Sequence, residues 1–325
     1  MRRYSSGSPS PSSFAQVLRR QKYQQAGSHA AVKKCRWLHM SLVEGRSCYK
    51  QRFYGIQSHR CVQMTPTIAC NLRCRFCWRT HPEDLPMPAW AGLPERFDEP
   101  EKIVEESLIA HRRILSGYRS QVIRGVIDER KYKEALNPRH AAISLDGEPT
   151  LYPEIGGLIS EFKVRGFTTF LVTNATQPHI LKRLGSEPSQ LYLSLHAPDE
   201  ESFEKVCSPT RKGLWRRVLE SLEASSGFSC PTVVRLTLAR GVNIDAPERY
   251  GRIISGAEPT YVEAKAYMSV GYSRLRLGFD YMPTHQEVAL FSEKLSKETG
   301  YRIVDSSPES RVVLLSRVGK PKELA

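Results

Sequence analysis

The sequence TPTIACNLRCRFCW at residues 65–78 holds three cysteines, Cys70, Cys74 and Cys77, in the spacing C-x3-C-x2-C. An apolar, β-branched run at residues 62–67 predicts a strand, so the three thiols belong to the loop that follows it. A closed structural zinc site takes four ligands, whereas three thiolates on a four-iron cluster leave one iron open. The triad therefore favours a cluster that binds a substrate or cofactor, with zinc completed by a fourth residue as the alternative.

Five further apolar runs predict strands at residues 141–145, 168–174, 190–196, 232–239 and 261–267. Helical spacing between them is clearest in Ile155, Leu158, Ile159 and Phe162, and in Leu214, Val218, Leu219 and Leu222. Strands that alternate with helices indicate a parallel sheet with right-handed crossovers. Periodicity alone allows either a doubly wound sheet or an incomplete barrel.

About 60 residues separate the first two predicted strands, which is too long for a loop without structure of its own. A helix is expected at residues 100–118, because Pro100 and nearby acids suit a helix N-terminus. A second helix is expected near residues 122–136.

The 325 residues are 40% hydrophobic with a net charge of +14, so the chain can bury a core, and its apolar runs are far too short to span a membrane. Residues 1–60 hold twelve Lys or Arg against the single acid Glu44, so +11 of the +14 lies there. A basic segment beside a neutral domain suits nucleic acid better than a membrane. A solubilising basic tail is the alternative.

Three more cysteines, Cys35, Cys48 and Cys61, recur at intervals of thirteen upstream of the first triad. Clustered cysteines without a secretory signal favour metal over disulfides and a cytoplasmic protein. They predict a second cluster with its own open iron, and zinc shared with a histidine such as His59 is the alternative. Cys207 and Cys230 stand alone and are expected to be bystanders.

These features divide the chain into four parts. Residues 1–30 are rich in Ser, Gln and Arg and predict a disordered or RNA-contacting extension. Residues 31–64 form the segment of the second cluster, residues 65–318 the core barrel, and residues 319–325 a tail.

The cysteine loop, with Phe76 before its last cysteine, resembles the cluster-binding loop of the radical S-adenosylmethionine (SAM) superfamily. The resemblance implies a partial (β/α)6 TIM-like barrel, here with an N-terminal cysteine-rich extension. It also implies SAM contacts from later strand ends. Gly147 and an exposed Glu148, in SLDGEP, would meet the methionine amino group, since a glycine allows close approach and a carboxylate accepts from an ammonium. Thr173 and Asn174 would reach the ribose, and active sites of barrels gather at such strand ends.

Six strings resemble the tRNA 4-demethylwyosine synthase family over roughly residues 33–318. They are CYKQRFYGIQSHRC (48–61), CNLRCRFCWR (70–79), SLDGEP (144–149), FLVTNAT (170–176), VVRLTLARGVN (233–243) and EAKAYM (263–268). The resemblance implies a radical SAM carbon–carbon lyase with two [4Fe-4S] clusters and SAM. Its reaction joins pyruvate carbons to N1-methylguanosine-37 of tRNA-Phe, making the tricyclic base of wyosine biosynthesis. Breaking an unactivated methyl C–H bond requires a radical, which cofactors supply.

By the same resemblance, Lys50 corresponds to the family lysine proposed to form a Schiff base with pyruvate. An imine requires an unprotonated amine. The cations Arg46 and Arg52 would favour loss of the proton and an anionic cluster would oppose it. Pyruvate bound directly to the open iron of the second cluster is the competing possibility.

Binding of the anticodon stem-loop of tRNA-Phe would use phosphate contacts and stacking on an extruded base. The expected contacts are Arg20, Lys22, Lys33, Lys34, Arg36, Trp37, Arg52 and Phe53, and Arg235 and Lys265 are weaker candidates for holding guanine or the pyruvate carboxylate. Without a flavodoxin-like module, as in the short family members, the electron would come from an external donor such as flavodoxin or ferredoxin. We expect a monomer.

One departure from the family pattern is His196, in SLHA, where an acid is common, so His196 is not expected to be catalytic. A methylthiotransferase or activating enzyme with an auxiliary cluster is an alternative, but it would not explain Lys50 or the FYGIQSHRC string. A non-catalytic zinc and RNA-binding protein is the alternative from another class.

Overall fold

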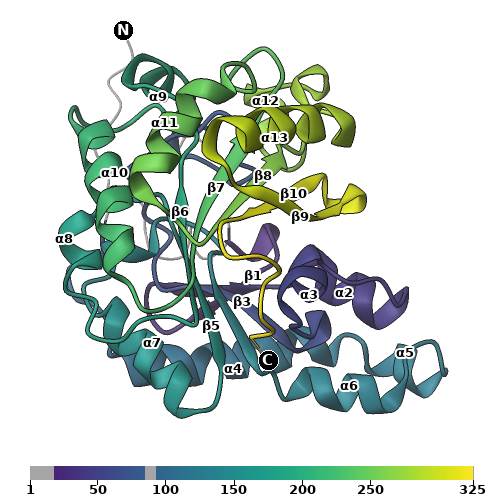
Figure 1. Ribbon diagram of the computed structural model, residues 1–325. Helices are drawn as coiled ribbons and strands as arrows, with labels where there is room; N and C mark the ends of the chain where they lie inside the picture. Colours follow the sequence, from purple (N-terminus) through teal and green to yellow (C-terminus); the bar gives the residue numbers. More distant parts are fainter. Residues whose placement is uncertain (1–17, 85–92, 325) are drawn as a thin grey trace, which may run out of the picture.

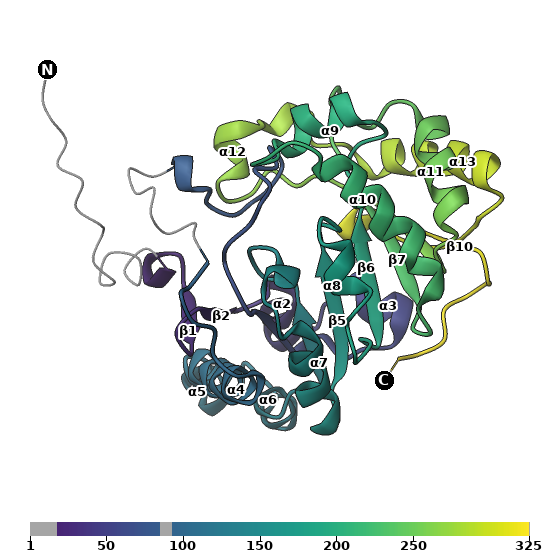
Figure 2. The ribbon, with the colours of Figure 1, turned by 90° about the vertical axis from the view of Figure 1, so that its left-hand side faces the viewer.

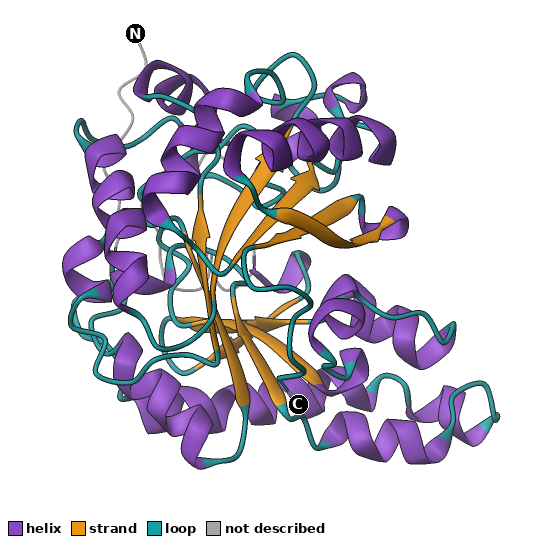
Figure 3. Ribbon diagram, in the orientation of Figure 1, coloured by secondary structure: helices purple, strands orange, loops and turns teal. Residues whose placement is uncertain are grey.

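The computed structural model describes residues 18–84 and 93–324, and its strands form one sheet in the order β1-β2-β3-β4-β5-β6-β7-β8-β10-β9 (Figure 1). Six successive strands pair in parallel: β3 (Cys61–Thr65), β4 (His140–Ile143), β5 (Thr168–Thr173), β6 (Gln190–Ser194), β7 (Thr232–Leu238) and β8 (Tyr261–Ala266). The six predicted strands are confirmed, with ends that move by two residues or fewer. The curved sheet with helices on its outer side confirms the incomplete α/β barrel (Figure 3).

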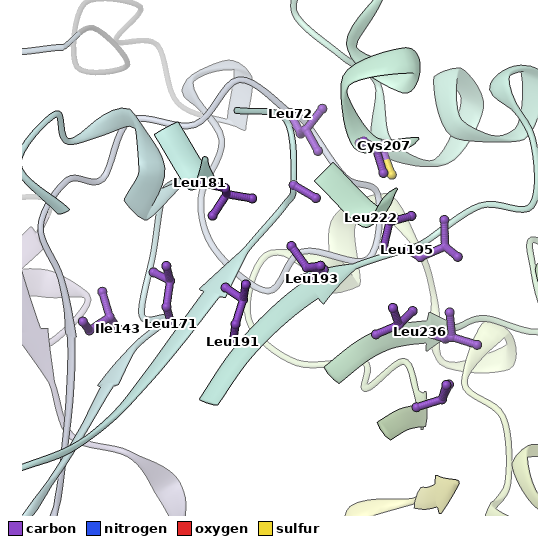
Figure 4. Packing of buried hydrophobic residues seen from close by; sticks show 14 of the residues in the cluster. Leu72, Ile143, Leu171, Leu181, Leu191, Leu193, Leu195, Cys207, Leu222 and Leu236 are labelled. Carbon is purple, nitrogen blue, oxygen red and sulfur yellow. The ribbon is translucent and has the colours of Figure 1, made fainter. Parts of the chain in front are cut away.

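The main core lies between the outer face of the sheet and the helices. Parallel strands buried on both faces become continuous apolar runs, and Figure 4 shows Leu171, Leu191 and Leu193 on neighbouring strands beside Leu222 of a helix. The covering helices include α7 (Ile155–Val164), α10 (Leu214–Glu223) and α11 (Pro247–Ala257). The predicted apolar face of α7 is buried.

In the described part of the long connection between β3 and β4 there are three α-helices where two were predicted. Helix α4 (Pro100–Ser116) has Pro100 in its first turn, as expected. The second predicted helix is instead two, α5 (Arg119–Ile123) and α6 (Glu129–Leu136). Gly125, at φ +71°, ends the first, and the Asp128 carboxylate accepts from the Lys131 backbone N–H (2.8 Å) to begin the second.

Antiparallel hairpins extend both edges of the parallel sheet. At one edge β2 (Ala30–Lys33) pairs with β3, and β1 (Tyr23–Ala26) pairs with β2. At the other edge β10 (Val312–Ser316) pairs with β8, and β9 (Arg302–Ser307) pairs with β10. A disordered extension is expected over residues 1–30, and residues 1–17 of it lie outside the described residues. From residue 23 the structure differs, because Tyr23 is buried and its hydroxyl donates to Asp146 (2.8 Å).

A short helix closes the amino-terminal end of the barrel from inside. Tyr49, Phe53 and Tyr54 of α3 (Tyr49–Tyr54) pack with Phe170 of β5 and Tyr192 of β6, which point into the curve of the sheet. Further α-helices with both ends among the described residues are α2 (Arg36–Val43), α8 (Pro178–Leu181), α9 (Glu200–Cys207), α12 (Ser273–Arg276) and α13 (His285–Thr299). Within the described ranges, no helix combines the length and apolar character needed to cross a membrane.

Gly156→Ala is expected to lower the free energy of unfolding by about 1–3 kcal/mol. A Cβ at Gly156 of α7 would overlap the backbone carbonyl of Leu184, and backbone cannot move aside cheaply. Urea denaturation measures the change. The matched control is Gly256→Ala in α11, where a Cβ meets nothing within 4 Å, so stability should stay equal or rise by up to about 1 kcal/mol. Equal effects in both variants would contradict this close approach.

Candidate active site

A cavity of about 420 Å³ opens inside the sheet at the carboxyl ends of the parallel strands. Eight of the predicted site residues line it: Cys70, Cys74, Phe76, Cys77, Gly147, Glu148, Thr173 and Asn174. They come from the loops after β3, β4 and β5, whose carboxyl ends meet at one edge of a parallel sheet. The structure therefore brings together all eight of these predicted residues, which follow β3 in the sequence.

The cysteine loop is fastened at its start to the end of α9. The backbone N–H of Arg73 donates to Cys207 O (2.8 Å) and that of Arg75 to Val206 O (2.9 Å). The buried Cys207 thiol lies beside Cys74 and is the main cause of the raised pKa of Cys74. Cys207 was expected to be a buried bystander; it is buried, and it lies next to the loop.

The loop thiols have the chemistry that an iron–sulfur cluster requires. Burial raises the pKa of Cys70 and Cys77, and Arg79, with Nη1 4.0 Å from Cys77 Sγ, opposes the shift at Cys77. Buried thiols without a cation nearby stay protonated, while a bound metal ionises them outright. The Asn174 amide nitrogen lies 3.9 Å from Cys70 Sγ and limits the space around it. Three thiols of one loop that line one cavity therefore fit a four-iron cluster.

Gly147 is required by packing against the backbone that leads from β3 into the cysteine loop. Its φ is +63°, and a Cβ there would overlap the backbone of Thr67, Ile68 and Ala69. The next residue confirms the close approach, since the Glu148 N–H donates to Ala69 O (2.8 Å). The loop after β4 and the cysteine loop therefore form one unit.

Glu148 is buried at 1% exposure, so the expectation of an exposed glutamate is wrong. Its carboxylate accepts from the Thr150 N–H (3.0 Å), the Thr173 hydroxyl (2.6 Å) and the Asn174 N–H (2.6 Å). Backbone N–H groups at the ends of adjacent strands lack ladder partners, and Glu148 satisfies them. It thus joins the ends of β4 and β5 at the wall of the cavity.

The upstream cysteines also approach one another. Burial raises the pKa of Cys61, and the charges of Cys35 and Cys48 add to the rise. The Ser58 hydroxyl donates to Cys48 Sγ (3.3 Å), and Cys48 precedes α3. Among the described residues, no three His, Cys, Asp or Glu side chains converge closely enough to hold a single metal ion. A four-iron cluster is larger, because its thiolates bind different irons.

Lys50 lies on α3 with its amine inside the barrel. Its Nζ is buried and has no hydrogen-bond partner among the described residues, and it lies 3.6 Å from the ring centroid of Tyr192 and 4.1 Å from that of Phe170. Burial holds the pKa of Lys50 well below its usual value, Glu263 opposes this and Arg235 reinforces it.

The cations expected to act on Lys50 do not point toward it. Arg52 pairs with Asp305 (2.7 Å), and Arg46 pairs with Glu309 (3.2 Å) on the surface. The helical turn of α3 sends Arg52 outward while Lys50 enters the barrel, and Arg46 lies in the loop between α2 and α3. Burial and Arg235, rather than Arg46 and Arg52, therefore favour loss of the proton from Lys50.

Glu263 of β8 is the main functional candidate that the sequence analysis missed. It has no exposed surface and accepts from the hydroxyls of Tyr49 (3.1 Å), Tyr54 (2.9 Å) and Tyr192 (3.0 Å) and from Arg235 Nη2 (2.9 Å). Burial alone would raise the pKa of Glu263, but Arg235 and the hydrogen bonds hold it below its usual value. An acid within the buried run YVEAKA was the available signal.

Arg235 and Lys265 line the cavity between Lys50 and the cysteine loop. Burial, with Arg235 nearby, lowers the pKa of Lys265 to about 8, and its Nζ lies 4.7 Å from the ring centroid of Tyr49. Two cations therefore face the cavity, which suits an anionic substrate group.

His196 also lines the cavity, and it is neutral. Burial and Arg235 lower its pKa to about 3, and its Nδ1 accepts from the Thr237 N–H (3.2 Å). Its ring packs edge-on against Phe76, with centroids 4.6 Å apart. His196 therefore makes a polar and stacking contact rather than carrying a charge.

The expected RNA contacts divide between surface and interior. Arg20, Lys22, Lys34, Arg36 and Arg52 are exposed, and Trp37 is half-buried. Lys33 lies 4.4 Å from the ring centroid of Tyr23 and 4.7 Å from that of Trp78. Phe53 is buried at 5% exposure among aromatic residues, so it cannot stack on RNA.

Two family models match this chain, a radical SAM superfamily model over residues 64–252 and a wyosine base formation model over residues 256–317. The chain is 49% identical over 314 residues to the S-adenosyl-L-methionine-dependent tRNA 4-demethylwyosine synthase of Pyrococcus abyssi, across 94% of this chain and 89% of that protein. It is 40% identical over 306 residues to the protein so named in Methanocaldococcus jannaschii, across 94% and 96%. A solved structure of TYW1 with a lysine-pyruvate adduct bound matches with a TM-score of 0.85 and 37% identity, across 96% of this chain and 97% of that one.

Arg235→Met is expected to lower the free energy of unfolding by about 3 kcal/mol, because it leaves the Glu263 carboxylate buried without its cation. Removing both charges, by Arg235→Met with Glu263→Leu, should restore part of the loss. Denaturant titration measures both variants. Arg240→Met is the control, since it breaks the more exposed pair with Glu287 and should cost much less. Equal losses in the two single variants would contradict the role assigned to the buried pair.

Proposed function

Because this chain belongs to the tRNA 4-demethylwyosine synthase family of radical SAM enzymes, we propose that it joins two carbons of pyruvate to the methyl group of N1-methylguanosine-37 in tRNA-Phe. The family assignment makes it an enzyme of wyosine biosynthesis that acts on tRNA with SAM and a [4Fe-4S] cluster. The product of the proposed reaction is the tricyclic base 4-demethylwyosine.

One observation carries the proposal: the buried Lys50 amine without a hydrogen-bond partner, inside a barrel whose other end holds the cysteine loop. A buried amine without a hydrogen-bond partner lowers the stability of the fold, so its presence calls for a functional explanation. A neutral amine attacks the pyruvate ketone, and loss of water leaves an imine that fixes the keto acid on Lys50. The lysine-pyruvate adduct in the solved relative supports this assignment.

The downstream site residues have assigned roles in this proposal. Cys70, Cys74 and Cys77 hold the cluster. The nucleoside part of SAM contacts Phe76, Thr173 and Asn174. The methionine part of SAM contacts Gly147 and Glu148. When bound, the cluster and SAM supply the radical that takes a hydrogen atom from the unactivated methyl group. The side chains exclude water from that radical and orient the reacting groups. Their convergence on one cavity is the support.

We assign a second cluster to Cys35, Cys48 and Cys61. The support is their mutual approach and their closeness to Lys50, since the charges of Cys48 and Cys61 oppose the lowering of the Lys50 pKa by burial. Such a cluster would lie beside the pyruvate adduct, and its open iron offers the alternative anchor for pyruvate. An external donor, such as flavodoxin or ferredoxin, supplies the electron in this proposal. The proposed protein is a monomer in the cytoplasm.

Reconstituted protein given SAM, pyruvate, dithionite and methylguanosine-containing tRNA is expected to form the tricyclic nucleoside, detected by mass spectrometry. With pyruvate and cyanoborohydride, the reduced adduct should appear on the peptide that contains Lys50. Lys50→Arg should lose both products, since a guanidinium does not form the imine. Lys205→Arg, at an exposed position on α9, is the matched control and should keep both. Full product from Lys50→Arg would refute the imine and leave the cysteine assignments standing.

Wild-type protein reconstituted without oxygen is expected to hold about eight irons, and a variant with Cys35, Cys48 and Cys61 all changed to Ala about four. Iron analysis and visible absorbance measure both. Cys230→Ala, which removes a cysteine outside both triads, should keep the full count. A wild-type protein with about four irons would disprove the second cluster, and a colourless zinc protein would disprove both.

A further inference from the structure

The segment after β8, residues 267–282, forms part of the rim of the cavity. Met268 and Val270 line the cavity, and the Tyr272 N–H donates to Trp78 O (2.9 Å) at the end of the cysteine loop. The Arg276 guanidinium donates to Arg79 O (2.9 Å) and contacts Cys77 O. These bonds fasten the segment to the loop proposed to hold the first cluster.

Three large apolar side chains of this segment point to solvent. Leu275 is 75% exposed, Phe279 is 70% exposed and Tyr281 is 40% exposed. The backbone that carries them is anchored, because Leu277 and Met282 are buried with Tyr267. Single exposed apolar residues are common, but three on one anchored segment beside a cavity indicate a contact surface.

Unpaired cations accompany these side chains at the same end of the strands. Arg274 is exposed within the segment, and Arg211 and Lys212 are exposed after α9, where the Thr210 N–H donates to Asn71 O (3.0 Å). Figure 2 shows α12 and α9 at this same end of the molecule. Among the described residues, none of these three cations takes part in an ion pair, whereas the neighbouring Arg240 is paired with Glu287.

The segment belongs to the part of the chain that distinguishes this family. The superfamily model ends at residue 252, and the wyosine base formation model covers residues 256–317, which include Leu275, Phe279 and Tyr281. Chemistry shared with the superfamily therefore does not account for these exposed residues, while a family-specific substrate does.

We propose that Leu275, Phe279 and Tyr281 form a stacking platform for the unpaired nucleotides beside the target base, with phosphates bound by Arg274, Arg211 and Lys212. This inference rests on the tRNA substrate of the function proposed above. Moving one base into the cavity unstacks its neighbours, and an aromatic ring at the rim replaces the lost stacking. The flanking cations match the charge of the RNA backbone.

The test measures binding of an anticodon stem-loop of tRNA-Phe, with N1-methylguanosine at position 37, by fluorescence anisotropy. Phe279→Ala is expected to raise the Kd about tenfold, whereas Phe279→Trp should bind like the wild type. Arg274→Gln should lower the slope of log K against log salt by about one. Val164→Ala is the matched control: it is 82% exposed at the end of α7, where the chain has returned to the amino ends of the strands.

An unchanged Kd for Phe279→Ala would overturn the platform. If this variant bound RNA normally but lost product only with a protein electron donor and not with dithionite, the surface would be a docking site for the reductant, and the proposal would be wrong. Binding needs no turnover, so failure of wild-type protein to make the tricyclic nucleoside would refute the proposed function separately.

Discussion

The carboxylate of Glu263 has no exposed surface, and its oxygens accept from three tyrosine hydroxyls and from Arg235. Tyr49 and Tyr54 both belong to α3, so this one carboxylate holds the helix inside the barrel. Lys50 lies between those two tyrosines, and its amine is placed over Tyr192 as a result. The position of the proposed nucleophile therefore depends on a buried charge that Arg235 and the tyrosine hydroxyls stabilise.

The interior of the barrel is layered along the strand direction. The inward-facing residues of the parallel strands first give an aromatic layer against α3, which includes Phe170 and Tyr192. Next comes a charged layer, which includes Arg235 and Glu263, and then the cavity with the cysteine loop. The period of two along each strand creates this order. It places the charged layer between a site suited to a keto acid and a site suited to SAM.

Much of this arrangement was predictable, because parallel strands buried on both faces leave continuous apolar runs and because thiols at fixed spacing restrict the chemistry. The errors arose where the partner is distant in sequence. Nothing near Glu148 shows that Thr173 and Asn174 will bury it, and the pairing of Glu263 with Tyr49 spans 214 positions. The hairpin at Tyr23 was missed because its strands are only four residues long and because β1, YQQA, is half polar.

The two antiparallel hairpins at the sheet edges have a topological consequence. A barrel closes only if its first and last strands pair, but β2 occupies the free edge of β3 and β10 that of β8. The six-stranded unit is therefore locked in an open form by its own termini. Side chains would largely fill a closed barrel of six strands, whereas the open sheet leaves room inside it for the cavity that the cysteine loop lines.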